Sequence, residues 1–259
     1  MINLKDVLRA RKLTIGSWIT LGHTSIPEIM RRAGYEWLTV DMEHSAITLS
    51  EMQTLIQVIE LSQVTPLVRV GNNDPSLIKR VMDAGSHGVI VPMVNSKDDA
   101  VKAVSAVKYP PMGTRGIGLA RAQGYGLEFE QYKRRINKDS IVIVQIEDIR
   151  AVDNLEEILG TDGVDGSIIG PYDLSASLGH AGDFEKPDMK QALKLYEDVC
   201  RRMKKPMGAH IVEPDPKIVL NYICKGYTFL AVGFDALYLG RKCREVMAAV
   251  RQASKKRPA

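Results

Sequence analysis

Short apolar runs rich in β-branched residues alternate along this chain with longer segments in which apolar residues recur at helical spacing. The short runs show no regular alternation with polar residues, which is typical of parallel strands buried on both faces. Eight such runs predict eight strands, over Thr14–Thr20, Trp37–Asp41, Pro66–Val70, Gly88–Val91, Ile141–Ile146, Gly166–Ile169, Met207–Ile211 and Phe229–Val232.

Helical segments separate the predicted strands, which favours parallel crossover connections. They cover Ile26–Ala33, Leu49–Glu60, Pro75–Ala84, Lys97–Val107, Arg150–Leu159, Met189–Met203, Asp215–Lys225 and Ala236–Ala253. This alternation over 259 residues is typical of a (β/α)8 TIM barrel, an α/β fold. A doubly wound open sheet would also alternate, but it usually has a glycine-rich phosphate turn after its first strand, which this chain lacks. We expect a single domain over residues 1–259, with disordered ends before about residue 4 and after about residue 251.

The interval from Tyr109 to Ser140 interrupts the regular alternation. Its first part, YPPMGTRGIGLARAQGYG, contains two prolines, five glycines and two arginines, so it cannot form one regular element. Long irregular loops in compact domains are often functional lids. We therefore expect this interval to help form the binding site.

Charge and cysteine content narrow the class of protein. The chain has 35 Lys and Arg against 31 Asp and Glu, a net charge of +4, and the charges are mostly interspersed, which argues against nucleic-acid binding. Its three cysteines are widely spaced and suggest a reducing compartment. No signal-like or membrane-spanning apolar stretch is present. We expect a cytoplasmic protein that does not contact a membrane.

Two predicted strands lead to carboxylates. Ile141–Ile146 is followed directly by Glu147, and Gly166–Ile169 is followed by Asp173 after a Gly-Pro turn. The carboxyl ends of parallel strands meet at one rim, so the two acids would repel each other unless a divalent cation held both ionised. The alternative is that each acid caps the helix that follows it.

Other polar residues also follow predicted strands. Asp41, Glu43 and His44 follow the second strand, and Arg69 lies near the end of the third. Each has a simpler explanation, because Arg69 could neutralise a neighbouring acid and His44 could be an ordinary loop histidine. Asp83 lies at a helix C-terminus, where an acid opposes the helix dipole, so we expect it to have a basic partner. No nucleophile elbow, paired-cysteine motif or His-x-x-x-His spacing supports a hydrolase triad or a zinc site.

Several ordered motifs resemble one known family. They are GYEWLTVDMEHSAITL, PLVRV, IKRVMDAGSHGVIVPMV, YPPMGTRGIG, VQIED, GVDGSIIGPYDLSASLG and AVGFD, between about Gly16 and Gly240. This order is similar to that of the metal-dependent, class II pyruvate aldolases of the HpcH/HpaI family, named for 4-hydroxy-2-oxoheptanedioate aldolase. The chain departs from that enzyme in the segment GLARAQGYG and at Tyr172, which replaces a small residue. Both departures lie in regions that set substrate specificity, so the substrate can differ from that of the heptanedioate enzyme.

The resemblance implies a (β/α)8 barrel that assembles as a homohexamer of paired subunits exchanging the last helix. It implies Mg²⁺ or Mn²⁺, with Co²⁺ as a further possibility, on Glu147 and Asp173. It also implies catalytic roles for His44, Arg69 and Asp83, with Asp83 reaching His44 across a subunit contact.

We expect the substrate to be contacted by a set of residues at the same rim, namely Arg69, Gln145, Gly170, Tyr172 and Asp173. Backbone N–H groups from Gly170 to Asp173 suit a substrate carboxylate. Arg69 would stabilise negative charge on a keto oxygen, and His44 would remove a proton from an alcohol. A Schiff-base mechanism is disfavoured because no lysine follows a predicted strand.

The predicted function is that of a class II pyruvate aldolase, an aldehyde-lyase (EC 4.1.2.-). It would reversibly cleave a 4-hydroxy-2-oxo acid to pyruvate and an aldehyde through the pyruvate enolate, with a cation beside the developing charge. Three alternatives remain open at this point. They are a decarboxylase of oxaloacetate-type 2-oxo acids, a lyase of the citramalyl- or malyl-coenzyme A type, and a non-catalytic protein that binds 2-oxo acids.

Overall fold

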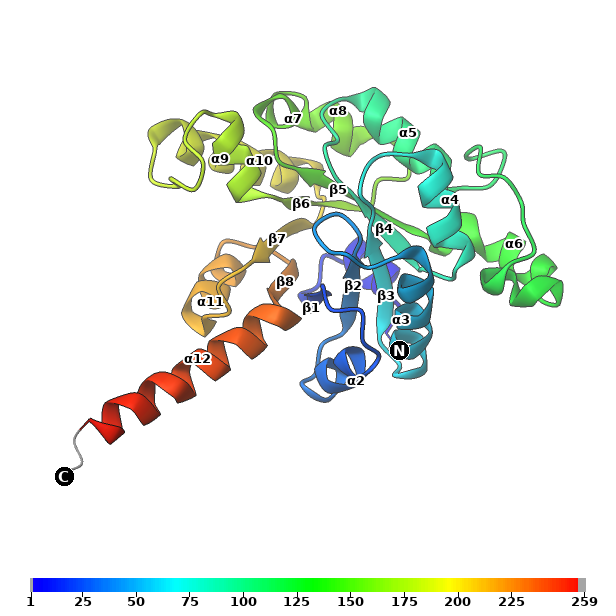
Figure 1. Cartoon of the computed structure of the whole chain (residues 1–259). Helices are drawn as coiled ribbons and strands as arrows, with labels where there is room; N and C mark the ends of the chain where they lie inside the picture. The colour runs from blue at the N-terminus through cyan, green and yellow to red at the C-terminus, as the bar shows by residue number, and fades with distance from the viewer. Residues whose placement is uncertain (1, 256–259) are drawn as a thin grey trace.

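Eight parallel strands pair in sequence order and close into a barrel, because β1 also pairs with β8. The computed structural model describes residues 2–255 (Figure 1). The strands are β1 (Thr14–Ile19), β2 (Trp37–Asp41), β3 (Thr65–Arg69), β4 (Gly88–Val91), β5 (Ile141–Ile146), β6 (Gly166–Ile169), β7 (Met207–Ile211) and β8 (Phe229–Phe234). The predicted (β/α)8 barrel is confirmed, with strand ends shifted by one or two residues.

Helices follow the strands and surround the barrel. Those predicted from the sequence are α2 (Ser25–Arg32), α3 (Leu49–Leu61), α4 (Pro75–Asp83), α5 (Lys97–Val107), α7 (Ile149–Asp153), α8 (Leu155–Gly160), α10 (Pro187–Met203), α11 (Pro216–Cys224) and α12 (Asp235–Ser254). The helix predicted over Arg150–Leu159 is thus two helices, which meet at Asn154.

Four further elements were not among the helices predicted between strands. They are α1 (Leu4–Arg9), the 3-10 helix η1 (Arg121–Gly126), α6 (Phe129–Asp139) and α9 (Pro171–Ser177). In α6 only Tyr132 and Ile136 are buried, so its sequence carries a weak apolar signal.

Side chains fill the barrel on both sides of the sheet. The interior contains Trp18, Trp37, Leu67, Ile90, Ile141, Ile143, Ile168 and Phe229, and Leu4 and Leu8 of α1 pack against them. A larger apolar layer lies between the strands and the surrounding helices. Successive strand residues point to opposite faces of the sheet, so every second residue of a strand points into the barrel. Polar residues that follow this alternation past the apolar core therefore lie at the ends of the strands.

The long interval between β4 and β5 lies near the amino ends of the strands. Arg121 of η1 donates to the Ala84 carbonyl just after α4 and forms an ion pair with Glu60 near the end of α3. These helix ends lie opposite the rim at which the strands end, since each helix runs back along the barrel. Within its own chain this interval therefore does not reach the rim, and its expected part in the binding site stays a prediction.

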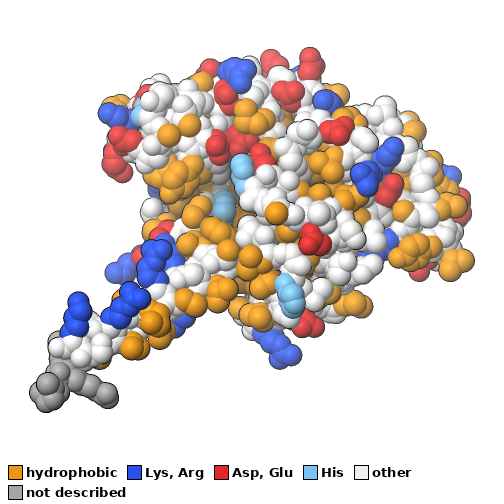
Figure 2. Space-filling view, viewed as in Figure 1, with side chains coloured by type: hydrophobic (Ala, Val, Ile, Leu, Met, Phe, Trp, Pro, Cys, Tyr) orange, Lys and Arg blue, Asp and Glu red, His pale blue; other side chains and the backbone are white. Residues whose placement is uncertain are grey.

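Helix α12 extends away from the barrel as a single rod (Figure 1). Asp235, at its start, is its only buried residue, and its large exposed apolar residues are Leu239, Val246, Met247 and Val250. Figure 2 shows hydrophobic side chains along this rod among Lys and Arg. The helix continues past Arg251 to Ser254, while Met1 and residues 256–259 of the predicted C-terminal tail lie outside the described residues. Within residues 2–255, no helix has the length and apolar character required to span a bilayer.

Gly16 lies where the interior of the barrel is tightly packed. It pairs with Trp37 across β1 and β2, and that ring stacks on Phe229 with centroids 4.3 Å apart. A Cβ on Gly16 would lie 2.1 Å from the Trp37 ring. We predict that Gly16→Ala lowers the free energy of unfolding by about 1–3 kcal/mol, because overpacking strains a filled core.

Urea unfolding measures this effect, and Gly240→Ala in α12 is the matched control. A Cβ on Gly240 would have no neighbour within 4 Å, so the control should leave stability unchanged or raise it slightly. Equal stabilities of Gly16→Ala and the parent protein would contradict the packing described here.

Candidate active site

Polar side chains converge at the carboxyl ends of the strands, around a small cavity of about 70 Å³. It is lined by Trp18, Arg69, Gln145, Tyr172, Asp173 and His210, among others. On β5 the inward-facing Ile141 and Ile143 belong to the barrel core. Gln145 and Glu147 continue the same alternation beyond it, so β5 itself directs both toward the rim.

Arg69 is held by the Asp41 carboxylate and the Trp18 ring. Its Nε and Nη2 donate to the two carboxylate oxygens of Asp41 at 2.9 and 2.7 Å, and its guanidinium lies 4.1 Å from the Trp18 ring centroid. Burial opposes ionisation of Asp41, but Arg69 and the backbone N–H groups of Glu43 and His44 keep the pKa of Asp41 below its usual value. The simpler role considered for Arg69, pairing with a neighbouring acid, is confirmed, and Arg69 also lines the cavity.

Glu43 is a second acid beside Arg69. One of its oxygens, Oε2, lies 3.1 Å from Arg69 Nη1 as an ion pair, but among residues 2–255 it has no partner with hydrogen-bond geometry. Burial raises the pKa of Glu43 to about 7, against the charge of Arg69, and repulsion from Glu147, Asp41 and Asp173 adds to the rise. The sequence placed Glu43 at the rim but gave no reason to assign it a role.

Glu147 is buried and held by two donors. Its Oε1 accepts the backbone N–H of Met93 at 2.6 Å, and its Oε2 accepts from the Gln145 amide. Burial raises the pKa of Glu147. The two hydrogen bonds oppose this rise, and the charge of the nearby Asp173 adds to it. The N-cap of α7 is Asp148, whose side chain accepts from the Arg150 backbone, so the alternative of Glu147 as a helix cap is wrong.

Asp173 lies in the first turn of α9, whose N-cap position is Gly170. The alternative of Asp173 as an N-cap is therefore also wrong. Gly170 makes room for Glu147, since a Cβ there would lie 3.1 Å from Glu147 Cβ and 3.3 Å from its Oε2. Tyr172 is 54% exposed at the mouth of the cavity and packs edge-on against Phe184.

The acids fit a hard divalent cation. The charges of Glu147 and Asp173 help to raise the pKa of Glu43, the charge of Asp173 helps to raise the pKa of Glu147, and Glu43 has a buried oxygen without a hydrogen bond among residues 2–255. Carboxylate oxygens are the donors that Mg²⁺ and Mn²⁺ prefer. Across residues 2–255, however, no group of three or more His, Cys, Asp or Glu side chains is arranged to hold an ion, so water or substrate would have to complete any coordination.

His44 and Asp83 do not meet within one chain. The His44 side chain is 66% exposed at the rim, with Nε2 3.8 Å from Glu43 Oε2. Asp83 ends α4 at the other end of the barrel, where it accepts from Arg115 Nη2 at 2.7 Å and Gln123 Nε2 at 3.3 Å. The predicted basic partner of Asp83 is thus confirmed as Arg115.

Three groups at the site were not predicted from the sequence. Trp18 lies under Arg69, Met93 supplies a backbone donor from a left-handed conformation (φ 52°), and His210 packs against Trp18. Burial lowers the pKa of His210 to about 4, so its imidazole is neutral at pH 7. His210 and Trp18 could have been found by continuing the inward-facing alternation of β7 and β1, whereas Met93 carries no comparable signal.

The barrel is closed and parallel, and acids and an arginine gather at the carboxyl ends of its strands. This is where enzymes with an α/β barrel have their active sites. The family described as HpcH/HpaI aldolase/citrate lyase matches residues 14–240, and the chain belongs to this family of aldolases and lyases. The resemblance noted in the sequence is confirmed.

Named relatives and a solved structure agree with this assignment. The chain is 39% identical over 246 residues to 2-dehydro-3,6-dideoxy-6-sulfogluconate aldolase of Pseudomonas putida, covering 95% of each. It is 36% identical over 232 residues to 5-keto-4-deoxy-D-glucarate aldolase of Shigella dysenteriae serotype 1, covering 89% of this chain and 90% of the relative. The crystal structure of a family member from Burkholderia cenocepacia matches 97% of this chain and 100% of its own, with 33% identity and a TM-score of 0.91.

The pair of Arg69 and Asp41 gives a stability prediction. Arg69→Met leaves the Asp41 carboxylate buried without its cation, so we predict a loss of about 3 kcal/mol in the free energy of unfolding. The double variant Arg69→Met/Asp41→Asn should lose less than the single one, because Asp41 no longer carries a stranded charge and Asn can still accept from the backbone. Denaturant unfolding at pH 7 in the presence of chelator measures both, and additive losses would contradict this explanation.

Proposed function

We propose that this protein is a class II pyruvate aldolase (EC 4.1.2.-) that cleaves a 4-hydroxy-2-oxo acid to pyruvate and an aldehyde. The observation that carries the proposal is the position of Arg69 on the wall of a cavity that Asp173 also lines, with Glu147 next to it. The names of the two aldolase relatives describe keto-deoxy sugar acids, which supports substrates of this chemical class. Cytoplasmic location remains part of the proposal.

In this reaction the bond between the third and fourth carbons breaks, and its electron pair forms the enolate of pyruvate. Negative charge therefore grows on the keto oxygen. The guanidinium of Arg69, already oriented by Asp41 and Trp18, would donate to that oxygen without reorganising. Gln145, Gly170 and Tyr172 would orient the acid, with the backbone N–H groups from Gly170 to Asp173 near its carboxylate.

Glu147 and Asp173 would hold a divalent cation, Mg²⁺ or Mn²⁺, which when bound would supply positive charge beside the keto and carboxylate oxygens. The Gln145 amide and the Met93 N–H orient Glu147. Gly170 would keep the space that this orientation requires, because a side chain there would press on the Glu147 carboxylate. These contacts would make Glu147 a preorganised ligand.

His44 would act as the base that takes the proton from the hydroxyl on the fourth carbon. It is exposed at the rim, and Asp83 lies at the far end of its own barrel, so only the Asp83 of an adjacent copy could orient it. Arg115 and Gln123 hold Asp83 in place for such a contact. The site would then be complete only in an oligomer.

The proposed assembly is a homohexamer of paired subunits that exchange α12. Support comes from the extension of α12 away from its own barrel and from its exposed apolar residues, which include Leu239 and Val246. A helix with this much exposed apolar surface gains stability by packing against another subunit. The small-molecule partners would be the 2-oxo acid and the aldehyde.

We predict that excess chelator abolishes cleavage and that Mg²⁺ or Mn²⁺ restores it. Glu147→Gln and Asp173→Asn should raise the metal concentration needed for half-maximal activity, because each removes a charged ligand. Asp148→Asn is the matched control, since Asp148 adjoins Glu147 but binds Arg150. Steady-state assays across a metal titration measure these effects, and full activity in excess chelator would refute the metal assignment.

We predict that His44→Ala and Asp83→Asn each slow aldol cleavage by about 10²-fold or more, a typical loss for a removed acid–base step. Decarboxylation of oxaloacetate, which forms the same enolate without deprotonating an alcohol, should be largely spared. The double variant should be little worse than the worse single variant, because the two residues would act as a unit.

Parallel assays of pyruvate release and carbon dioxide release measure this separation. His180→Ala is the control, because His180 pairs with Asp188 away from the cavity. Equal losses of both reactions in His44→Ala would assign His44 to enolate support instead, and additive losses would remove Asp83 from the proton-transfer step.

A further inference from the structure

His210 is a polar residue of the candidate active site to which the proposed reaction gives no role. It lies near the end of β7 and lines the cavity together with Trp18 and Arg69. Its ring packs against Trp18 with centroids 5.0 Å apart and against Phe234 with centroids 6.4 Å apart. Two aromatic side chains therefore hold the imidazole, and one of them also lies under the Arg69 guanidinium.

A backbone carbonyl of β8 determines which ring nitrogen of His210 carries the proton. Nε2 lies 3.2 Å from the Gly233 oxygen, and a carbonyl oxygen can only accept, so Nε2 is the donor. Ser17 Oγ donates to the same oxygen at 3.1 Å. Gly233 has φ +56°, and a Cβ there would lie 2.6 Å from the Tyr238 ring, so this backbone position requires glycine. The neutral ring therefore presents Nδ1 as an acceptor without a proton.

This acceptor is free. Among residues 2–255, Nδ1 of His210 has no hydrogen-bond partner. The Nδ1 atom of His180 is enclosed without a partner, whereas that of His210 is open to the cavity that the side chain lines. A ligand in the cavity can therefore reach it.

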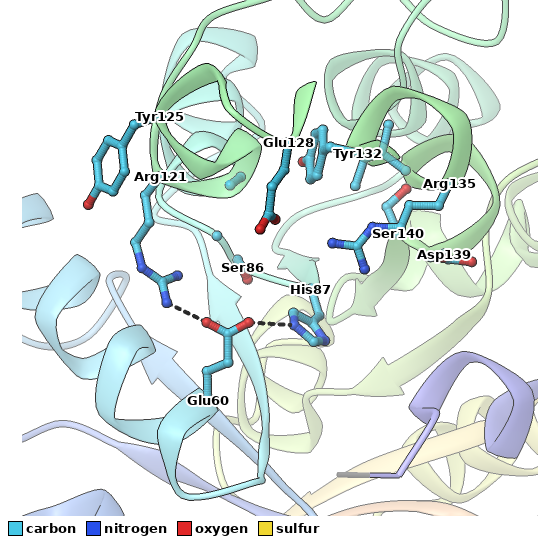
Figure 3. Close-up of a pocket in the computed structure, with 13 residues that line it drawn as sticks. Glu60, Ser86, His87, Arg121, Tyr125, Glu128, Tyr132, Arg135, Asp139 and Ser140 are labelled. Atoms are coloured by element: carbon cyan, nitrogen blue, oxygen red, sulfur yellow. Dashed lines mark hydrogen bonds and ion pairs between the residues drawn. The ribbon is translucent and has the colours of Figure 1, made fainter. Parts of the chain in front are cut away.

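Polar groups in the larger hollow at the amino ends of the strands have their partners already. Arg121 and Glu60 form an ion pair there, and Glu60 Oε1 lies 3.5 Å from His87 Nε2 (Figure 3). The charged side chains of α6 that line this hollow are exposed to water. Groups that water satisfies require no ligand, whereas Nδ1 of His210 faces the space that the substrate would fill.

The group that binds at Nδ1 must donate a hydrogen bond and be uncharged. A carboxylate has no proton to donate. Arg69 lies close enough to help lower the pKa of His210, so an ammonium group at Nδ1 would meet the positive charge of Arg69. A hydroxyl group meets both requirements.

We propose that His210 selects a 4,5-dihydroxy-2-oxo acid by accepting a hydrogen bond from the hydroxyl on the fifth carbon. This inference rests on the proposed function, in which Arg69, Glu147 and Asp173 face the carboxylate and keto groups and His44 faces the fourth carbon. These groups follow strands β2 to β6, whereas His210 lies on β7 beside β8 and β1. The next carbon of the substrate extends toward that part of the rim, and the aldehyde released is a 2-hydroxyaldehyde.

Two unreactive analogues test the proposal by titration calorimetry on the intact protein with Mg²⁺. N-(2-hydroxyethyl)oxamate has a hydroxyl on its fifth position, N-propyloxamate has a methyl group there instead, and the amide nitrogen at the third position prevents cleavage. The parent protein should bind the hydroxyl compound about tenfold more tightly, the upper range for one hydrogen bond. His210→Leu should abolish this preference. His210→Asn should keep most of it, because the side-chain oxygen of Asn can lie near the position of Nδ1.

His23→Leu is the matched control, because His23 is exposed on the loop after β1 and does not line the cavity. It should leave the preference unchanged, and thermal unfolding checks that all three variants are folded. Equal binding of the two analogues by the parent protein would overturn the proposal, whatever the variants do. So would a preference that His210→Leu leaves unchanged.

Addition of pyruvate to glycolaldehyde separates this inference from the proposed function. No aldol product from a protein that still prefers the hydroxyl analogue would overturn the aldolase proposal and leave the selection by His210 intact. Aldol product from a protein without that preference would overturn only the role of His210. Failure of both analogues to bind in the presence of Mg²⁺ would overturn both.

Discussion

Closure of eight parallel strands around one axis is the constraint on which the site depends. Every second strand residue must point inward, so the interior fills with apolar side chains until each strand ends. On β5 the same alternation that buries Ile141 and Ile143 carries on to Gln145 and Glu147. The candidate active site is therefore the last inward-facing layer of the core.

The rim holds more carboxylates than cationic side chains. Arg69 contacts both Asp41 and Glu43, while Glu147 and Asp173 lie close enough to raise the pKa of Glu43. Burial makes this excess of negative charge costly, because a low dielectric strengthens repulsion. A bound divalent cation would offset that cost, which would explain how these acids can lie together at one rim.

The two ends of the barrel differ in what they hold. The carboxyl ends gather the acids and Arg69, whereas the amino ends carry α1 and η1. Asp83 belongs to the second group, since Arg115 and Gln123 hold it there. His44 and Asp83 therefore lie at opposite ends of the barrel within one chain. Helix α12 extends away from the barrel with apolar residues exposed. The proposed assembly would explain both features.

The sequence by itself determined the barrel fold and which residues lie at the carboxyl ends of the strands. The number of strands, their apolar pattern and the residues that follow each strand are local properties of the chain. It placed Arg69, Glu147 and Asp173 at one face. Only the tertiary structure showed that Asp148 caps α7, that Arg69 pairs with Asp41 and that Trp18 and His210 complete the cavity. It also moved the long β4–β5 interval to the opposite end of the barrel. These features depend on contacts between segments far apart in the chain, which residue spacing does not encode.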